Sequence, residues 1–112
     1  MNAVATPKQT EVRRNLPGSQ HVTRTFVVNL VHGLHARPCA MLVKVLQPHC
    51  VEVNVESNGE QASGKSILGL MALGAGHGSN ITFTISGEDA LRAMDQLEQL
   101  FSSNFESAYL AR

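Results

Sequence analysis

The sequence predicts an α+β domain in which helices cover one face of a mostly antiparallel sheet. Short segments with strand character alternate with segments of helical period, in the order β-α-β-β-α-β-α. Two of the strands are separated by Ser57-Asn58-Gly59, and Asn-Gly is among the dipeptides most typical of a tight hairpin turn. Other strands alternate apolar and polar side chains, as a sheet covered on one face requires.

Four segments have the composition or the period of a strand. Residues 23–30 are rich in β-branched and aromatic side chains, and residues 51–56 alternate strictly. Residues 60–63 would be the short return strand of the hairpin, and residues 80–86 place three apolar side chains on one face. The opposite face of the sheet should be polar, with Glu52, Asn54, Glu56, Thr82 and Thr84.

The first helix is expected to begin near Ala36. Pro38 suits its first turn, where the missing N–H costs no hydrogen bond, and Pro48 ends it by restricting the residue before it. Between them, apolar side chains recur at helical spacing and predict one buried face, made of Cys39, Leu42, Val43 and Leu46.

Two further helices are expected. Residues 65–73 form a short helical pattern, with Ser66 as a candidate N-cap and Gly74 as a candidate stop. Residues 86–89 resemble a capping box, and the apolar spacing that follows predicts a helix that runs to about Ser103.

We expect the domain to span residues 23–103. Residues 1–22 are polar and mixed, without helical or strand period, so we expect a disordered N-terminal extension. Residues 104–112 are expected to form a frayed C-terminal tail.

Composition narrows the possible functions. Nine Lys and Arg balance nine Asp and Glu, so the chain lacks the positive excess with which nucleic-acid and membrane-surface binders attract phosphate. It contains no apolar run of about 18 residues and no signal-peptide core. Cys39 and Cys50 are too few for a disulfide framework. We therefore expect a soluble, cytoplasmic and monomeric protein with reduced thiols.

The stretch from Val31 to Ala40, V-H-G-L-H-A-R-P-C-A, places chemistry at the start of the first helix. A helix N-terminus carries partial positive charge and backbone N–H groups without partners, so it binds phosphate readily. His35 precedes this end, Gly33 permits a sharp turn before it, and Arg37 can add a charge-assisted bond. This arrangement suits an imidazole that accepts and returns a phosphoryl group. It offers neither a carboxylate pair nor a nucleotide-binding loop, which indicates a carrier and not an enzyme.

The residues alone leave two other interpretations open. A single histidine at a helix start is often an ordinary cap or a solvent contact. A metal site is conceivable, but the spacing matches no common zinc pattern, and we expect neither a metal nor another cofactor. Its candidate ligands would be His32, His35, Cys39, His49 and Cys50.

Three motifs resemble those of the HPr family, the histidine-containing phosphocarriers of the phosphoenolpyruvate-dependent phosphotransferase system. H-G-L-H-A-R-P resembles the active-site pattern N-G-L-H-x-R-P-A. N-G-E-Q-A-S-G-K-S-I-L-G-L-M and G-S-N-I-T-F-T-I-S-G-E-D-A match two further stretches, so the resemblance covers about residues 23–101. It implies an open-faced β-sandwich, with a four-stranded antiparallel sheet and three helices on one face.

The resemblance also implies the roles of three side chains. His35 would be the phosphoryl acceptor, as a pros-phosphohistidine, and Arg37 would steady the phosphate. Phosphorylated enzyme I would donate the group and an enzyme IIA-type domain would receive it, as in sugar uptake. Ser66 would match the regulatory serine that an HPr kinase/phosphorylase modifies in some bacteria.

The helix after Ser66 is more apolar than one buried face of a short helix requires. Some of its side chains should form an exposed patch of the kind that marks a protein interface. Adding about two negative charges at Ser66 should disturb the docking of an acidic partner there. The expected partner-binding residues are Ile67, Leu68, Leu70 and Met71.

The sequence departs from the family pattern in three places. His32 stands where asparagine is usual, Cys39 replaces a small alanine and is better explained by packing than by redox chemistry, and the N-terminal extension is not a family feature. The stretch L-F-S-S-N-F is similar to the tail of NPr, the paralogue in the nitrogen-related branch. The alternatives are therefore an NPr-like or Ser66-centred protein that regulates partners by binding, and an unrelated small enzyme or ligand-sensing domain.

Overall fold

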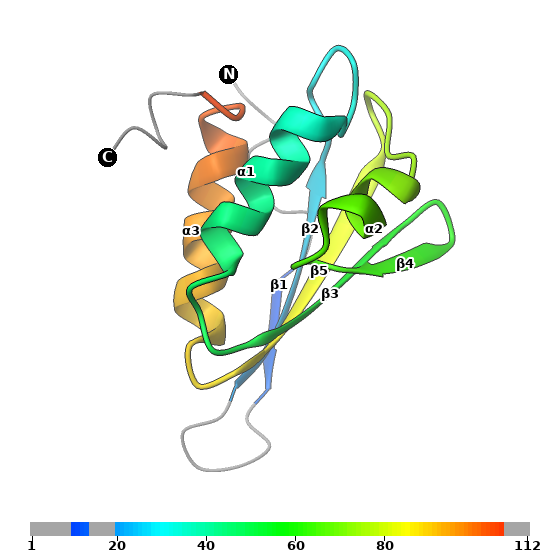
Figure 1. Ribbon diagram of the computed structural model, residues 1–112. Coiled ribbons are helices and arrows are strands. Elements are labelled where there is room, and N and C mark those ends of the chain that lie inside the picture. Colours follow the sequence, from blue (N-terminus) through cyan, green and yellow to red (C-terminus); the bar gives the residue numbers. More distant parts are fainter. Residues whose placement is uncertain (1–9, 14–19, 107–112) are drawn as a thin grey trace.

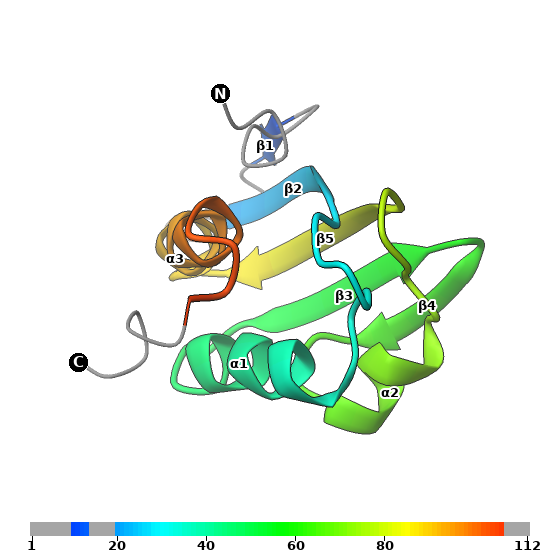
Figure 2. The same ribbon diagram turned by 90° about the horizontal axis from the view of Figure 1, so that it is seen from above.

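The computed structural model describes residues 10–13 and 20–106 (Figure 1). Within these residues the strands form one five-stranded sheet in the order β1-β2-β5-β3-β4, and every pair is antiparallel. The three helices lie on one side of this sheet, with α1 and α2 next to each other (Figure 2). In chain order the elements are β1 (Thr10–Arg13), β2 (Gln20–Val27), α1 (Ala36–Leu46), β3 (Glu52–Ser57), β4 (Glu60–Ser63), α2 (Ile67–Ala72), β5 (Asn80–Gly87) and α3 (Ala90–Ser102).

The predicted α+β architecture is confirmed, because the four expected strands and three expected helices are all present. The structure adds β1, which the sequence did not predict. The expectation of an unstructured segment over residues 1–22 is wrong for residues 10–13, which pair with the edge of β2, and for residues 20–22, which belong to β2 itself. An edge strand offers unpaired backbone groups that a β-prone segment can satisfy. Residues 1–9 and 14–19 lie outside the described part of the chain.

The core lies between the inner face of the sheet and the helices. Phe26 of β2 stacks on Phe101 of α3, with ring centroids 4.4 Å apart and planes 2° apart. Phe83 of β5 meets both rings edge-on. Phe105 is also buried and packs edge-on against Phe101, so the expectation of a frayed tail from residue 104 is wrong as far as residue 105. Residues 107–112 lie outside the described residues.

The first two helices follow the sequence prediction closely. Three of the four residues expected on the buried face of α1 are fully buried, and Val43 is partly buried. The α2 helix begins after Ser66, whose Oγ accepts a hydrogen bond from the Gly69 N–H at 3.0 Å. Gly74 follows the end of α2 with a φ of +66°, a backbone conformation that favours glycine. No helix among the described residues is long and apolar enough to cross a membrane.

The predicted capping box before α3 is wrong. Ser86 still belongs to β5, and the N-cap residue is Asp89, whose side chain does not cap the helix. The Asp89 carboxylate instead lies 2.6 Å from Nδ1 of the buried His49. A contact between residues 40 positions apart therefore replaces the local cap.

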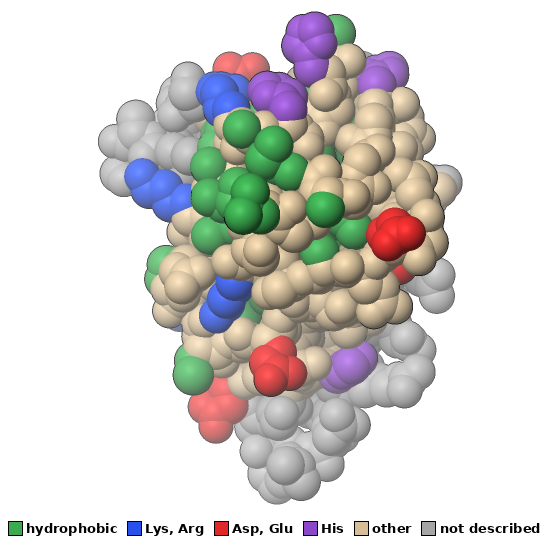
Figure 3. Space-filling view, turned by 45° about the vertical axis from the view of Figure 1, so that its right-hand side comes forward, with side chains coloured by type: hydrophobic (Ala, Val, Ile, Leu, Met, Phe, Trp, Pro, Cys, Tyr) green, Lys and Arg blue, Asp and Glu red, His purple; other side chains and the backbone are tan. Residues whose placement is uncertain are grey.

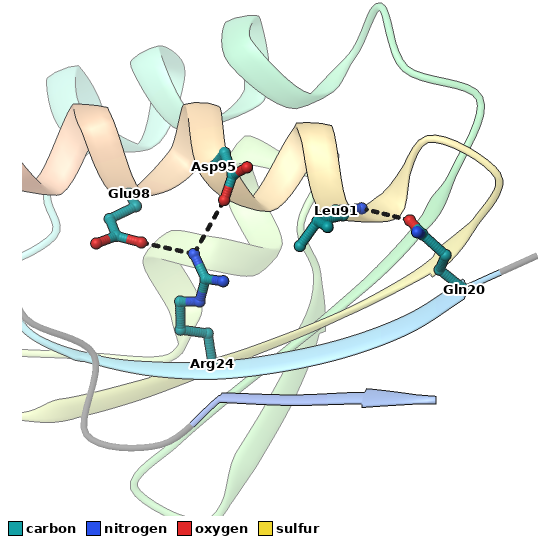
Figure 4. A network of polar contacts seen from close by, with 5 residues as sticks. All are labelled: Gln20, Arg24, Leu91, Asp95 and Glu98. Carbon is teal, nitrogen blue, oxygen red and sulfur yellow. Dashed lines mark hydrogen bonds and ion pairs between the residues drawn. The ribbon is translucent and has the colours of Figure 1, made fainter. Parts of the chain in front are cut away.

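Polar contacts also join β2 to α3 (Figure 4). The Gln20 Oε1 accepts a hydrogen bond from the Leu91 N–H at 2.9 Å, which satisfies one of the free donors of the first turn. Arg24 lies on the inner face of β2, and its guanidinium contacts Glu98 at 2.6 Å and Asp95 at 3.4 Å. These contacts help to hold α3 against β2 and β5, while α1 packs against both α3 and α2.

Candidate functional site

The loop that leads into α1 is held against the loop between α2 and β5. The Leu34 N–H donates to the Ala75 carbonyl at 2.9 Å. Val28 exchanges two backbone bonds with the same loop, donating to the Ser79 carbonyl and accepting from the Gly78 N–H. Leu34 is itself buried, so its side chain anchors the loop in the core. The start of α1 is therefore held in place by backbone hydrogen bonds to the neighbouring loop and by the buried Leu34 side chain.

Gly33 is required by the geometry of this loop. Its φ is +68°, in the left-handed region that side chains rarely adopt. A Cβ at this position would lie 2.7 Å from the Ala75 carbonyl oxygen and 2.9 Å from the Gly76 Cα. Both atoms belong to the backbone, so the neighbouring loop would have to move to admit it. The glycine thus allows the two loops to approach closely just before His35.

His35 occupies the N-cap position of α1, with extended backbone. Its carbonyl accepts the Cys39 N–H at 3.1 Å, while its side chain makes no capping bond. The side chain is exposed. The interpretation of His35 as an ordinary side-chain cap therefore finds no support, and the imidazole is accessible to a reacting group.

The helix end next to His35 offers donors for an anion. The N–H groups of Ala36 and Arg37 precede the first possible intrahelical bond, and no backbone acceptor among the described residues meets them. The Arg37 side chain is exposed, and within the described residues it has no ion-pair partner. The first turn of α1 contains no acidic residue that would compete for these groups. A phosphoryl group at this end would meet positive charge and free hydrogen-bond donors.

Cys39 serves packing. Its side chain is fully buried, and Sγ donates to the Leu34 carbonyl at 3.5 Å. Burial raises the pKa of the Cys39 thiol to about 11, because the thiolate would lose its hydration. The thiol is therefore protonated and unreactive near neutral pH, which agrees with the packing role expected for Cys39.

An exposed apolar surface lies beside the helix start, over α2 and the beginning of α1 (Figure 3). Leu68 is 80% exposed, and Ile67 and Met71 are each 39% exposed. Leu70 is an exception to the expected set, because it is fully buried and belongs to the core. Val31, which was not among the expected residues, is 83% exposed in the loop before His35. We call Ile67, Leu68 and Met71 the apolar patch.

The histidines and cysteines do not gather into one group. The His32 ring lies near the His35 ring, with centroids 6.1 Å apart and planes at 76°. His49 lies elsewhere, where its ring contacts Asp89 and Gln96. Within the described ranges no three His, Cys, Asp or Glu side chains come close enough together to hold a metal ion.

The fold and the helix-start histidine together describe a small phosphoryl-carrier domain. Residues 22–103 match the family model described as PTS HPr component phosphorylation site. The chain belongs to this family, the HPr phosphocarriers of the phosphotransferase system.

Similar proteins and structures agree with this assignment. The phosphocarrier protein HPr of Cupriavidus necator is 40% identical over 81 residues, which cover 72% of this chain and 90% of that protein. The multiphosphoryl transfer protein of Salmonella typhimurium is 42% identical over 72 residues, 62% of this chain, but the match spans only 19% of that protein's length. The crystal structure of HPr-C-His from Thermoanaerobacter tengcongensis superposes with a TM-score of 0.70 at 31% identity, covering 74% of this chain and 93% of that one.

Proposed function

We propose that this protein accepts a phosphoryl group from phosphorylated enzyme I on the His35 imidazole and passes it to an enzyme IIA-type domain. One observation carries the proposal. The exposed imidazole of His35 makes no capping bond and stands at the free N-terminus of α1. The Arg37 guanidinium follows in the first turn, and it has no ion-pair partner among the described residues. Membership of the HPr family supports the same assignment.

The proposed chemistry is a transfer between two imidazoles. A ring nitrogen of His35 attacks the phosphorus atom and forms a P–N bond, while the P–N bond of the donor breaks and its electron pair returns to the donor ring. The family pattern implies that the attacking atom is Nδ1. The helix N–H groups and Arg37 bind the phosphoryl oxygens as the group arrives, so little reorganisation accompanies the transfer. The reverse sequence hands the group to the acceptor, and the protein returns to its starting state.

The apolar patch is the proposed docking surface for both partners. The patch lies on α2, which packs against α1, and Figure 3 shows exposed hydrophobic side chains near histidine side chains, so one contact surface can present the imidazole to donor and acceptor in turn. Two partners that bind to this same patch cannot bind at the same time, which fits a carrier that shuttles between them. The absence of acidic side chains from the first turn of α1 favours partners that are acidic around their own active sites.

Ser66 is the proposed regulatory site. Its Oγ caps α2 at the margin of the patch, where it is partly buried. A phosphate on Oγ would stay near the positive helix end but would add about two negative charges beside Ile67. An HPr kinase/phosphorylase would be the modifying enzyme. Because Ser66 lies at the margin of the patch, a mainly regulatory role is the second candidate function.

A two-stage relay experiment tests the proposal. The protein is mixed with phosphoenolpyruvate and enzyme I, the phosphorylated form is isolated, and a purified enzyme IIA domain is added. The proposal predicts that the phosphate moves stoichiometrically to the added domain. A phosphorylated protein that donates to no such domain, while Ser66→Asp alters partner affinity and His35→Ala does not, would favour the regulatory function.

A further inference from the structure

His32 is a second exposed imidazole beside the proposed phosphoryl acceptor. The two rings meet edge to face, with centroids 6.1 Å apart. His32 is exposed, and no hydrogen bond holds it to another described residue. Both of its nitrogens are therefore available to a group that arrives on His35.

The two segments that build the site around His32 contain no acidic side chain. Residues 28–51 and residues 61–87 include no Asp or Glu at all. The start of α1 carries His35 and Arg37, and the loop against which the loop of His32 packs carries His77. His77 lies 3.3 Å from the Asn29 side-chain oxygen.

We propose that His32 donates a hydrogen bond to the phosphoryl group on His35 and, when protonated, prolongs the life of the phosphorylated form. This rests on the proposed role of His35. The phosphoryl group brings close to two negative charges at neutral pH, and a protonated imidazole donates a charge-assisted bond of about 2.8 Å to such oxygens. A charged donor binds phosphoryl oxygens more strongly than a neutral one, so the stabilisation should strengthen as pH falls. His32 forms no bond to phosphorus in this scheme, and it gives up no electrons.

The test compares the rate at which phosphate is lost from isolated phosphorylated proteins. The variants are His32→Leu, which removes the donor, and His32→Gln, which keeps a neutral donor that cannot titrate. His77→Gln is the matched control, since it removes a neighbouring exposed imidazole outside the ring pair. Loss is followed by intact mass from about pH 6 to about pH 8.5, a range that brackets the usual titration of histidine. Each rate is divided by that of the unmodified protein at the same pH, because phosphohistidine is itself labile in acid.

The expected result is a ratio that depends on pH. His32→Leu should lose phosphate about fivefold faster at about pH 6 and only slightly faster at about pH 8.5. His32→Gln should show a smaller ratio that does not change with pH, and His77→Gln should match the unmodified protein throughout. A His32→Leu ratio that is flat or close to one would overturn the proposal, as would phosphorylation of His32 itself in a His35→Ala variant. If the unmodified, folded protein gains no phosphate from enzyme I, the proposed function fails first and the role of His32 fails with it.

Discussion

Replacing Gly33 by alanine tests how the loop before His35 is built. The glycine φ of +68° costs an L-residue about 1–2 kcal/mol. The added Cβ would also lie 2.7 Å from the Ala75 carbonyl oxygen and 2.9 Å from the Gly76 Cα, two backbone atoms that cannot rotate away. Such overpacking typically costs about 1–3 kcal/mol more. Gly33→Ala should therefore lower the free energy of unfolding by about 2–5 kcal/mol, and it should slow phosphoryl acceptance because His35 moves with the loop.

Gly59→Ala separates the two contributions. Gly59 has a φ of +79° in the β3–β4 turn, but a Cβ there would meet nothing within 4 Å. Its substitution should therefore show the conformational cost alone, about 1–2 kcal/mol, and leave phosphoryl acceptance unchanged. Both free energies come from urea unfolding followed by circular dichroism. Equal losses for the two variants would refute the claim that close contact with the neighbouring loop holds Gly33 in place.

Three further predictions follow from burial and capping. Leu70→Ala should cost about 2–5 kcal/mol in urea unfolding, whereas Leu68→Ala should change stability by less than about 0.5 kcal/mol and weaken enzyme I binding in calorimetry. The reverse order would mean that the apolar patch has been assigned to the wrong side of α2. Ser66→Ala should lose about 1 kcal/mol with the cap, and Ser66→Asp should retain most of it, because a carboxylate also accepts the N–H bond. Since burial raises the pKa of Cys39 to about 11, iodoacetamide at about pH 8 should label Cys50 alone in the native protein and both cysteines after unfolding. Rapid native labelling of Cys39 would contradict its burial.

Local signals in the sequence predicted local structure well. The Asn58-Gly59 turn adopts positive φ at both residues, as a tight hairpin requires. The Ser66 cap forms as expected, because an N-cap depends only on the three residues that follow it. The placement of His35 at the helix start was predictable for the same reason, since Pro38 and the apolar spacing after it define where α1 begins.

The features that the sequence did not reveal depend on residues far apart in the chain. No local signal in the sequence marks Arg24 as buried, yet it is buried, and Glu98 of α3 lies 2.6 Å from its guanidinium. The Asp89 carboxylate leaves its expected capping role because the fold places His49 within 2.6 Å. Leu70 and Leu68 are chemically identical, and a helix of six residues is too short for its period to show which of them faces the core.

The central claim is that His35 carries the phosphoryl group, and intact-mass analysis after mixing with phosphoenolpyruvate and enzyme I tests it most directly. The unmodified protein should gain a single phosphate that is lost in acid. The His35→Ala variant should gain none while its circular dichroism spectrum is unchanged. Full phosphorylation of folded His35→Ala, or none in the folded unmodified protein, would contradict the account.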